Sequence, residues 1–130
     1  MDELYYKLCF YVPTSHVEQV KNAIFEAGAG HIGDYDCCCF QTLGQGQFRP
    51  LEGSNPYIGE TGGEVEVVEE YRVETICPAS RVQTVISALR LAHPYEEPAI
   101  DLWRKRCLHR EDVGSALPDS RCKHRFPQKQ

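Results

Sequence analysis

Two stretches that lie 65 residues apart decide the fold: YKLCFYVPTSHV (Tyr6–Val17) and YRVETICPASRV (Tyr71–Val82). Each has a tyrosine followed by a basic residue, and later a proline, a serine and a valine at alternate positions. A repeat at a fixed spacing indicates that one structural unit occurs twice. Each copy has the pattern of an apolar strand, a break at proline and then a helix.

The helix starts carry a recognisable signature. Ser15 with Glu18, and Ser80 with Gln83, both fit the capping box, in which the two side chains satisfy free backbone N–H groups. Apolar residues at helical spacing follow both serines. The two predicted apolar faces are formed by Val17, Val20, Ile24 and Phe25, and by Val82, Val85, Ile86 and Leu89.

The segments after each helix complete the pattern. Alternating residues predict strands over Tyr35–Gln41 and Ala99–Trp103, and a long strand over Glu64–Cys77 with a bulge near Val67–Val68. Residues Leu43–Gly63 lack strand or helix periodicity and are expected to form a long loop.

This order of elements predicts an α+β, ferredoxin-like (βαββαβ) domain with an antiparallel sheet and both helices on one face. The other face is still partly apolar, so we expect another subunit to cover it. We assign residues 1–104 to this domain and residues 105–130 to a basic, flexible C-terminal tail.

Charge and composition exclude several classes of protein. Residues 1–104 carry seven basic and 16 acidic residues, a poor match to nucleic acid, whereas residues 105–130 carry seven basic and three acidic ones. No secretory signal and no apolar run long enough to span a membrane is visible. The seven cysteines are odd in number, and three are consecutive. We therefore expect reduced thiols and a cytoplasmic location.

The long loop contains the segment FRPLEGSNPYIG (Phe48–Gly59), which mixes apolar residues with turn residues. This composition favours an ordered loop over a flexible linker. Arg49 beside Glu52 is suited to orienting a small anionic or polar ligand. The alternative is a self-packed Ω-loop in which these two residues form an internal ion pair.

Two polar connections follow the helices. His93–Pro98 contains an imidazole and two carboxylates, and Gly30–Tyr35 occupies the equivalent place in the first copy. From the repeat we expect both connections at the same end of the sheet, where they would converge on a divalent zinc or copper ion. The alternative is that the histidines only form hydrogen bonds within their loops. The candidate ligands are His31, Asp34, His93, Glu96 and Glu97.

Three motifs resemble a known family: GAGHIG (Gly28–Gly33) with Tyr35, the Phe48–Gly59 segment, and HPYEEPA (His93–Ala99). They are similar to the PII/CutA-like domain inserted in YqfO-type proteins of the NGG-interacting-factor family, also labelled GTP cyclohydrolase type-2 homologues. The last motif is also similar to a segment of the CutA divalent-cation-tolerance proteins. The resemblance implies a ferredoxin-like fold that assembles as a homotrimer, with ligands between loops and subunits.

The resemblance also supplies candidate ligand-binding positions. They are Gly30, His31, Gly33, Tyr35, Arg49, Glu52, Gly53, Pro56, Gly59, His93, Tyr95, Glu96 and Glu97, and of these His31, His93, Glu96 and Glu97 are the candidate metal ligands.

Three functions follow as hypotheses. The first is a non-catalytic oligomeric module that binds a divalent metal or a small ligand. The second is a metal-dependent hydrolase related to GTP cyclohydrolase, for which this sequence offers no H-x-x-H pair. The third is a regulatory module that contacts a protein partner through the basic tail.

Overall fold

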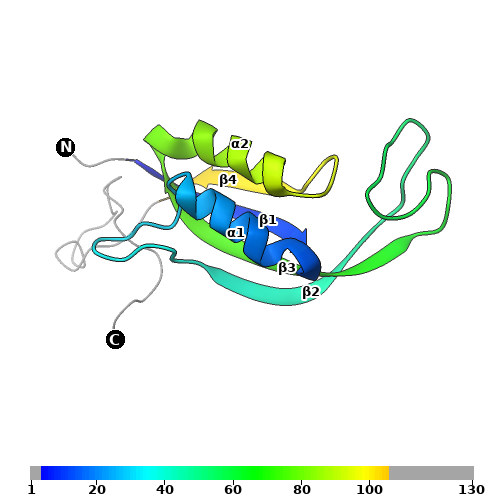
Figure 1. Ribbon diagram of the computed structural model, residues 1–130, viewed down its shortest axis with the longest axis horizontal. Coiled ribbons are helices and arrows are strands. Elements are labelled where there is room, and N and C mark those ends of the chain that lie inside the picture. Colours follow the sequence, from blue (N-terminus) through cyan, green and yellow to red (C-terminus); the bar gives the residue numbers. More distant parts are fainter. Residues whose placement is uncertain (1–3, 106–130) are drawn as a thin grey trace, which may run out of the picture.

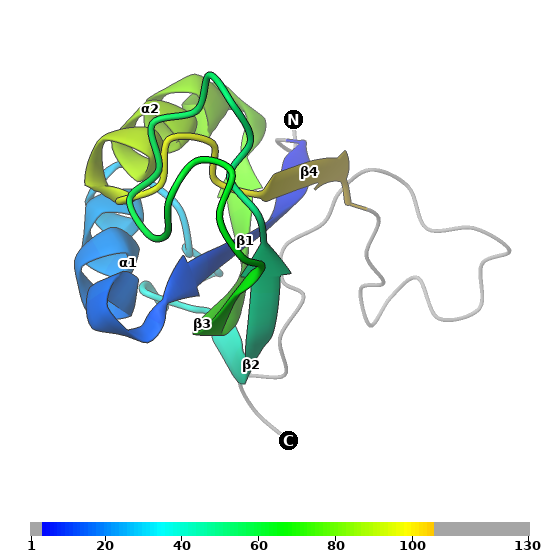
Figure 2. The same ribbon diagram turned by 90° about the vertical axis from the view of Figure 1, so that its right-hand side faces the viewer.

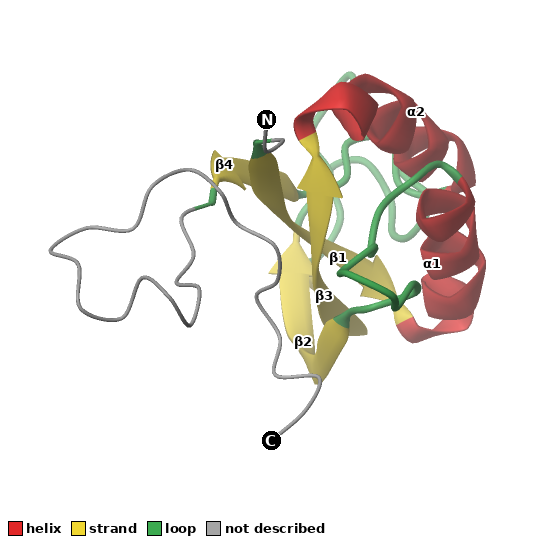
Figure 3. Cartoon of the chain, turned by 90° about the vertical axis from the view of Figure 1, so that its left-hand side faces the viewer, coloured by secondary structure: helices red, strands yellow, loops and turns green. Residues whose placement is uncertain are grey.

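In the computed structural model, residues 4–105 form an antiparallel four-stranded sheet with two helices packed on one face (Figures 1 and 3). The structure describes residues 4–105, so the predicted tail lies outside the described residues except for Lys105. The sheet has the order β2-β3-β1-β4, and the predicted α+β ferredoxin-like fold is confirmed. The elements are β1 (Tyr5–Pro13), α1 (Val17–Glu26), β2 (Phe40–Phe48), β3 (Glu66–Pro78), α2 (Val82–Ala92) and β4 (Ile100–Arg104).

The core lies between the helices and the two central strands. Alternate residues of β1 point to the helices, and Leu8, Phe10 and Val12 are fully buried there. Val73 of β3 joins them, because β1 and β3 pair along their length with Phe10 opposite Val73. The helices contribute the apolar residues that the sequence predicted, among them Val20, Ile24, Val85 and Leu89. Burial of these side chains is the main term that holds the sheet and helices together.

The predicted capping boxes are wrong. Ser15 and Ser80 lie inside short 3-10 turns, Thr14–His16 and Ala79–Arg81, which come between each strand and its helix. The residues at the start of α1 and α2 are His16 and Arg81, and neither makes a side-chain capping hydrogen bond. The 3-10 turn moves the helix start past the serine, to His16 and Arg81.

The predicted strand over Tyr35–Gln41 is also misplaced, since β2 spans Phe40–Phe48. Tyr35 instead pairs with Ile32 in an isolated bridge, and the loop assigned to Leu43–Gly63 loses its first residues to β2. Residues such as Gly44 and Gly46 have low intrinsic strand preference. They are extended here because they pair continuously with β3, which is a tertiary effect.

The bulge predicted near Val67–Val68 does not form. Gln47 lies opposite Val67 and Gly46 opposite Val68 in an uninterrupted register. Val67 is exposed, because this end of the β2–β3 ribbon extends beyond the helices (Figure 1). With neither face packed on the helices, the apolar residues there need not keep to one side of the sheet.

The sheet face opposite the helices carries charged and aromatic groups. Lys7 is almost buried, forms an ion pair with Glu74 at 2.8 Å and lies 5.8 Å from the centre of the Trp103 ring. Phe40 and Trp103 are exposed on the edge strands of this face. The five cysteines within residues 4–105 form no disulfide, and no helix in that range is long and apolar enough to cross a membrane.

Candidate functional site

Two loops meet beyond one end of the sheet: the long loop (residues 49–65) between β2 and β3, and the α2–β4 loop (residues 93–99) (Figure 2). The backbone N–H of Asn55 donates to Oε1 of Glu96 at 2.9 Å, which joins the two loops. Within the long loop, the N–H of Gly62 donates to the carbonyl of Pro50 at 2.9 Å and closes its base. The long loop is therefore ordered by its own hydrogen bonds and by its contact with the second loop.

A cavity of about 620 Å³ lies between these loops and the neighbouring ends of the strands. A volume of this size is in the range that accommodates a small molecule. Most of its lining is contributed by the two loops, and the strands supply the rest. The lining residues are Tyr11, Gly46, Gln47, Phe48, Arg49, Pro50, Leu51, Ser54, Pro56, Tyr57, Ile58, Glu70, Tyr95, Glu96, Glu97 and Ala99.

Aromatic rings form one wall of this cavity. The ring centre of Tyr95 lies 5.8 Å from that of Phe48 and 6.3 Å from that of Tyr57, with tilted planes in both pairs. These are the separations of rings in mutual contact. The three side chains come from both loops and the end of β2, so the wall exists only when the loops are docked.

Glu70 of β3 is held against the aromatic wall. The Tyr95 hydroxyl donates to Oε2 of Glu70 at 2.7 Å, and Glu70 is only 9% exposed. Burial, together with the neighbouring Glu70 carboxylate, raises the pKa of Tyr95 well above its usual range. Tyr95 therefore remains a neutral hydrogen-bond donor at physiological pH.

Gly46 leaves the space that the Glu70 carboxylate occupies, because a Cβ at this position would overlap Oε1 of Glu70. Gly46→Ala is expected to displace the carboxylate, break its bond to the Tyr95 hydroxyl and so lower the pKa of Tyr95 toward the ordinary value. The cost in folding should be about 1–3 kcal/mol, because a hydrogen bond to a buried carboxylate is lost although only the end of a flexible side chain must move. Ultraviolet titration of the tyrosines measures the change.

Gly44→Ala is the matched control, since it lies on the same strand and a Cβ there would meet nothing within 4 Å. A Tyr95 titration that is the same in both variants would contradict the role assigned to Gly46.

His93 fixes the start of the α2–β4 loop through hydrogen bonds to two residues that line the cavity, Tyr11 and Tyr95. Its Nε2–H donates to the carbonyl of Tyr11 at 2.7 Å, and its Nδ1 accepts from the backbone N–H of Tyr95 at 3.1 Å. A carbonyl only accepts and a backbone N–H only donates, so the ring is the neutral Nε2–H tautomer. Burial lowers the pKa of His93 below its ordinary value, consistent with this neutral form.

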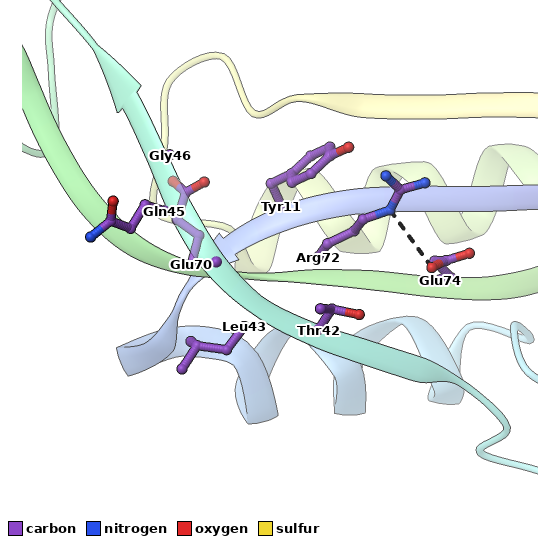
Figure 4. Close-up of a pocket in the computed structure, with 9 residues that line it drawn as sticks. Tyr11, Thr42, Leu43, Gln45, Gly46, Glu70, Arg72 and Glu74 are labelled. Atoms are coloured by element: carbon purple, nitrogen blue, oxygen red, sulfur yellow. Dashed lines mark ion pairs between the residues drawn. The ribbon is translucent and has the colours of Figure 1, made fainter.

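A second cavity, of about 510 Å³, opens on the sheet face opposite the helices (Figure 4). It contains Arg72, whose Nε lies 3.7 Å from a carboxylate oxygen of Glu74 and whose guanidinium stands 5.9 Å from the Tyr11 ring centre. The two cavities share Tyr11, Gly46 and Glu70. Glu70 therefore belongs to the walls of both.

The structure brings some of the residues predicted from sequence together. Those that line the larger cavity are Arg49, Pro56, Tyr95, Glu96 and Glu97. Glu52, Gly53 and Gly59 lie on the long loop, but they are not among the lining residues. No ion pair joins Arg49 to Glu52 within the described part of the chain, so the internal pair considered for an Ω-loop does not form.

The predicted convergence of the two histidine-containing connections is wrong. The N–H of Gly30 donates to the carbonyl of Ile76, at the end of the sheet where β1 begins, whereas His93 contacts Tyr11 near the end of β1. Figure 1 shows the two connections at opposite ends of the molecule. The physical reason is that each helix returns the chain to the end of the sheet at which its preceding strand began. Because β1 and β3 are antiparallel, they begin at opposite ends, and the two connections therefore lie at opposite ends.

The metal site predicted from His31, Asp34, His93, Glu96 and Glu97 is therefore not formed. His31 and Asp34 are exposed at the far end, and both ring nitrogens of His93 are engaged in hydrogen bonds. Among residues 4–105, no three histidine, cysteine, aspartate or glutamate side chains are placed to hold one ion. Gly30, Gly33 and Tyr35 stay with His31 at the far end and do not contribute to the cavity.

Sequence reasoning missed several residues of the site. Phe48 and Tyr57 lie in the loop segment that the sequence singled out, and two aromatic residues among turn residues were a usable signal. Glu70 gave no signal, since it lies in the middle of an alternating strand and reaches the site only through strand register. Tyr11 likewise enters the cavity through its position near the end of β1.

This chain is similar in sequence to one part of several longer proteins. It is 48% identical over 101 residues to the GTP cyclohydrolase 1 type 2 homolog of Halalkalibacterium halodurans, covering 78% of this chain and 27% of that protein. The proteins of the same name from Mycobacterium leprae and Bacillus subtilis are each 50% identical over 97 residues, with 25% and 26% of their lengths covered. The chain thus spans about a quarter of the curated relatives it matches. No family model matches it.

Solved structures support the same relationship. A Bacillus cereus protein related to NIF3 superposes with a TM-score of 0.68 at 45% identity, covering 81% of this chain and 26% of that one. CutA from Archaeoglobus fulgidus, named a divalent cation tolerance protein, superposes with a TM-score of 0.59 at 15% identity, covering 82% and 89%. The resemblance inferred from the three motifs is confirmed, and the CutA match shows a shared fold.

Proposed function

We propose that this chain, a homologue of one segment of the proteins named GTP cyclohydrolase 1 type 2 homolog, is a non-catalytic binding module for a small organic ligand. The ligand site is the larger cavity, between the long loop and the α2–β4 loop. The observation that carries the proposal is the bond between the Asn55 N–H and the Glu96 carboxylate, because it docks the two loops around a lined cavity.

The lining is suited to binding rather than to turnover. It offers aromatic faces, hydroxyl groups and carboxylates, but the described lining residues include no histidine, cysteine or lysine. The Tyr95 hydroxyl donates to Glu70, and its raised pKa keeps it protonated, so it is not available as a general base at neutral pH. The activity in the relatives' name belongs to longer proteins, of which this chain matches only about a quarter, and we do not assign it to this chain.

We further propose that the module is cytoplasmic and assembles with copies of itself, as a homotrimer according to the resemblance of its motifs. Two features support self-association. β2 is a long edge strand that carries no charged side chain, and such edges readily pair with another strand. Phe40 and Trp103 are exposed on the edge strands of the open sheet face. Light scattering on the protein as it elutes from a size-exclusion column measures the number of chains, which we expect to be three.

The ligand site is tested by a fragment titration followed by amide NMR, using small amines, carboxylates, neutral aromatic compounds and, separately, zinc. We expect fragments of one organic class to shift the amides of Tyr95, Glu96 and residues 49–58, while zinc leaves them unchanged. Tyr57→Ser, which removes one of the three rings of the aromatic wall, should abolish these shifts.

Tyr35→Ser is the matched control, because Tyr35 and Tyr57 are similarly exposed, at 57% and 53%, and Tyr35 lies at the other end of the sheet. Fragment shifts that cluster around Tyr35, or zinc shifts at Glu96 and Glu97, would refute the assignment of the site.

A further inference from the structure

The charges of the larger cavity point to the kind of ligand that it takes. Three carboxylates line it, from Glu70, Glu96 and Glu97, against a single guanidinium from Arg49. Two of the carboxylates are fixed in place: Glu70 by the Tyr95 hydroxyl and Glu96 by the Asn55 N–H. The excess of negative charge is thus built into the wall and favours a positively charged ligand.

The aromatic wall has the same preference. The faces of Phe48, Tyr57 and Tyr95 carry the negative part of the ring quadrupole, which attracts a cation lying within about 6 Å of the ring centre. Leu51, Pro56 and Ile58 add apolar side chains to the lining of the same cavity. A ligand for this lining needs both positive charge and apolar surface.

These features disfavour a metal ion. A divalent cation such as magnesium or calcium binds several oxygen ligands at short distances and gives up its water reluctantly. In this cavity the Glu70 and Glu96 carboxylates already accept hydrogen bonds from the protein, and residues 4–105 contain no cluster of three metal-binding side chains. An organic cation is weakly hydrated, so contact with rings can replace its water at lower cost.

We infer that the larger cavity binds a small organic cation, a quaternary ammonium or alkylated amine, with its charge between the aromatic wall and the carboxylates of Glu70 and Glu97. This inference rests on the proposed function, since it names the ligand class for the same site. The inferred ligand is not a metal ion, because the candidate metal ligands lie at opposite ends of the sheet and are not arranged to hold one.

The test compares choline with 3,3-dimethyl-1-butanol, a neutral molecule of the same shape, by calorimetry and amide NMR on the full chain. Choline should bind about tenfold more tightly, because only its charge engages the ring faces and carboxylates. Equal affinity of the two probes would overturn the inference, although the proposed binding site would survive. Failure of every fragment class at this cavity would instead refute the proposed function itself.

Two pairs of variants locate the effect. Tyr57→Leu keeps an apolar side chain but removes a ring, and should weaken choline about fivefold or more, whereas Tyr35→Leu should not. Glu97→Gln should weaken the binding of choline and leave the affinity for the neutral probe unchanged. Glu52→Gln, on the long loop but outside the cavity lining, should change neither affinity. Choline binding that is unaffected by both Tyr57→Leu and Glu97→Gln would contradict the inferred position of the charge.

Discussion

His93→Ala is expected to lower the free energy of unfolding by about 2–4 kcal/mol, one of the two largest effects that we predict. The substitution removes a buried ring and leaves the Tyr11 carbonyl and the Tyr95 N–H without their partner. Because the Tyr95 ring contacts both other rings of the aromatic wall, the cavity should also lose its shape. Urea unfolding measures the first effect, and the amide spectrum of residues 93–99 measures the second.

His31→Ala is the control, since His31 is exposed at the opposite end of the sheet. It should change stability by no more than about 0.5 kcal/mol. Equal losses in the two variants would contradict the supporting role of His93.

The same histidine should make stability depend on pH. Its pKa in the folded protein lies below that in the unfolded chain, because burial disfavours the charged ring more than Glu70 and the Tyr11 carbonyl favour it, while His16 also opposes the charge. The unfolded state therefore takes up the proton first. The stabilisation is complete above about pH 6.5 and decreases as the pH falls toward the lower, folded-state pKa.

The measurement is the change in unfolding free energy between about pH 7.5 and pH 5.5, a range that brackets the ordinary pKa of histidine. Wild type should lose more stability over this range than His93→Ala. A larger loss in the variant would show that His93 is not the group responsible.

Gly30→Ala should be comparably destabilising, by about 2–4 kcal/mol, because two costs add. Gly30 has φ +84, a left-handed conformation in which side chains are unfavourable. A Cβ there would also lie 2.9 Å from the Phe25 ring and 3.0 Å from the backbone nitrogen of Cys38. That nitrogen donates to the Gly30 carbonyl, so the local backbone cannot move without losing a hydrogen bond.

Gly33→Ala separates the two costs. Gly33 also has positive φ, at +55, but a Cβ there would meet nothing within 4 Å. Only the conformational cost applies, so the expected loss is about 1–2 kcal/mol. A loss for Gly30→Ala no greater than that for Gly33→Ala would mean that the close contacts contribute nothing to the effect.

The parts of the fold that the sequence predicts are those set by local patterns. The repeat around Pro13 and Pro78, and the apolar faces of both helices, suffice for the βαββαβ order and for the core. β2 could not be placed, because its glycines and glutamines carry no strand signal and are extended only by pairing with β3. Local patterns also could not reveal the 3-10 turns that displace the helix starts.

The sequence predicts part of the candidate site but not all of it. The loop segments containing Arg49 and Tyr95 are the ones that meet, but the partner expected for His93 lies at the other end. Because β1 and β3 are antiparallel, the two copies are related by a rotation that exchanges the ends of the sheet, so equivalent connections lie at opposite ends. Contacts such as that of Glu70 with Tyr95 depend on register, which no local pattern contains.

Glu70 stands in the walls of both cavities, one on the open sheet face and one between the loops. A molecule that drew this carboxylate toward one cavity would withdraw it from the other, so occupancy of one cavity would alter affinity at its neighbour. By thermodynamic reciprocity the influence is equal in both directions. A single glutamate, next to Gly46, is thus the residue through which the exposed surface of the sheet would be coupled to the chamber formed by the loops.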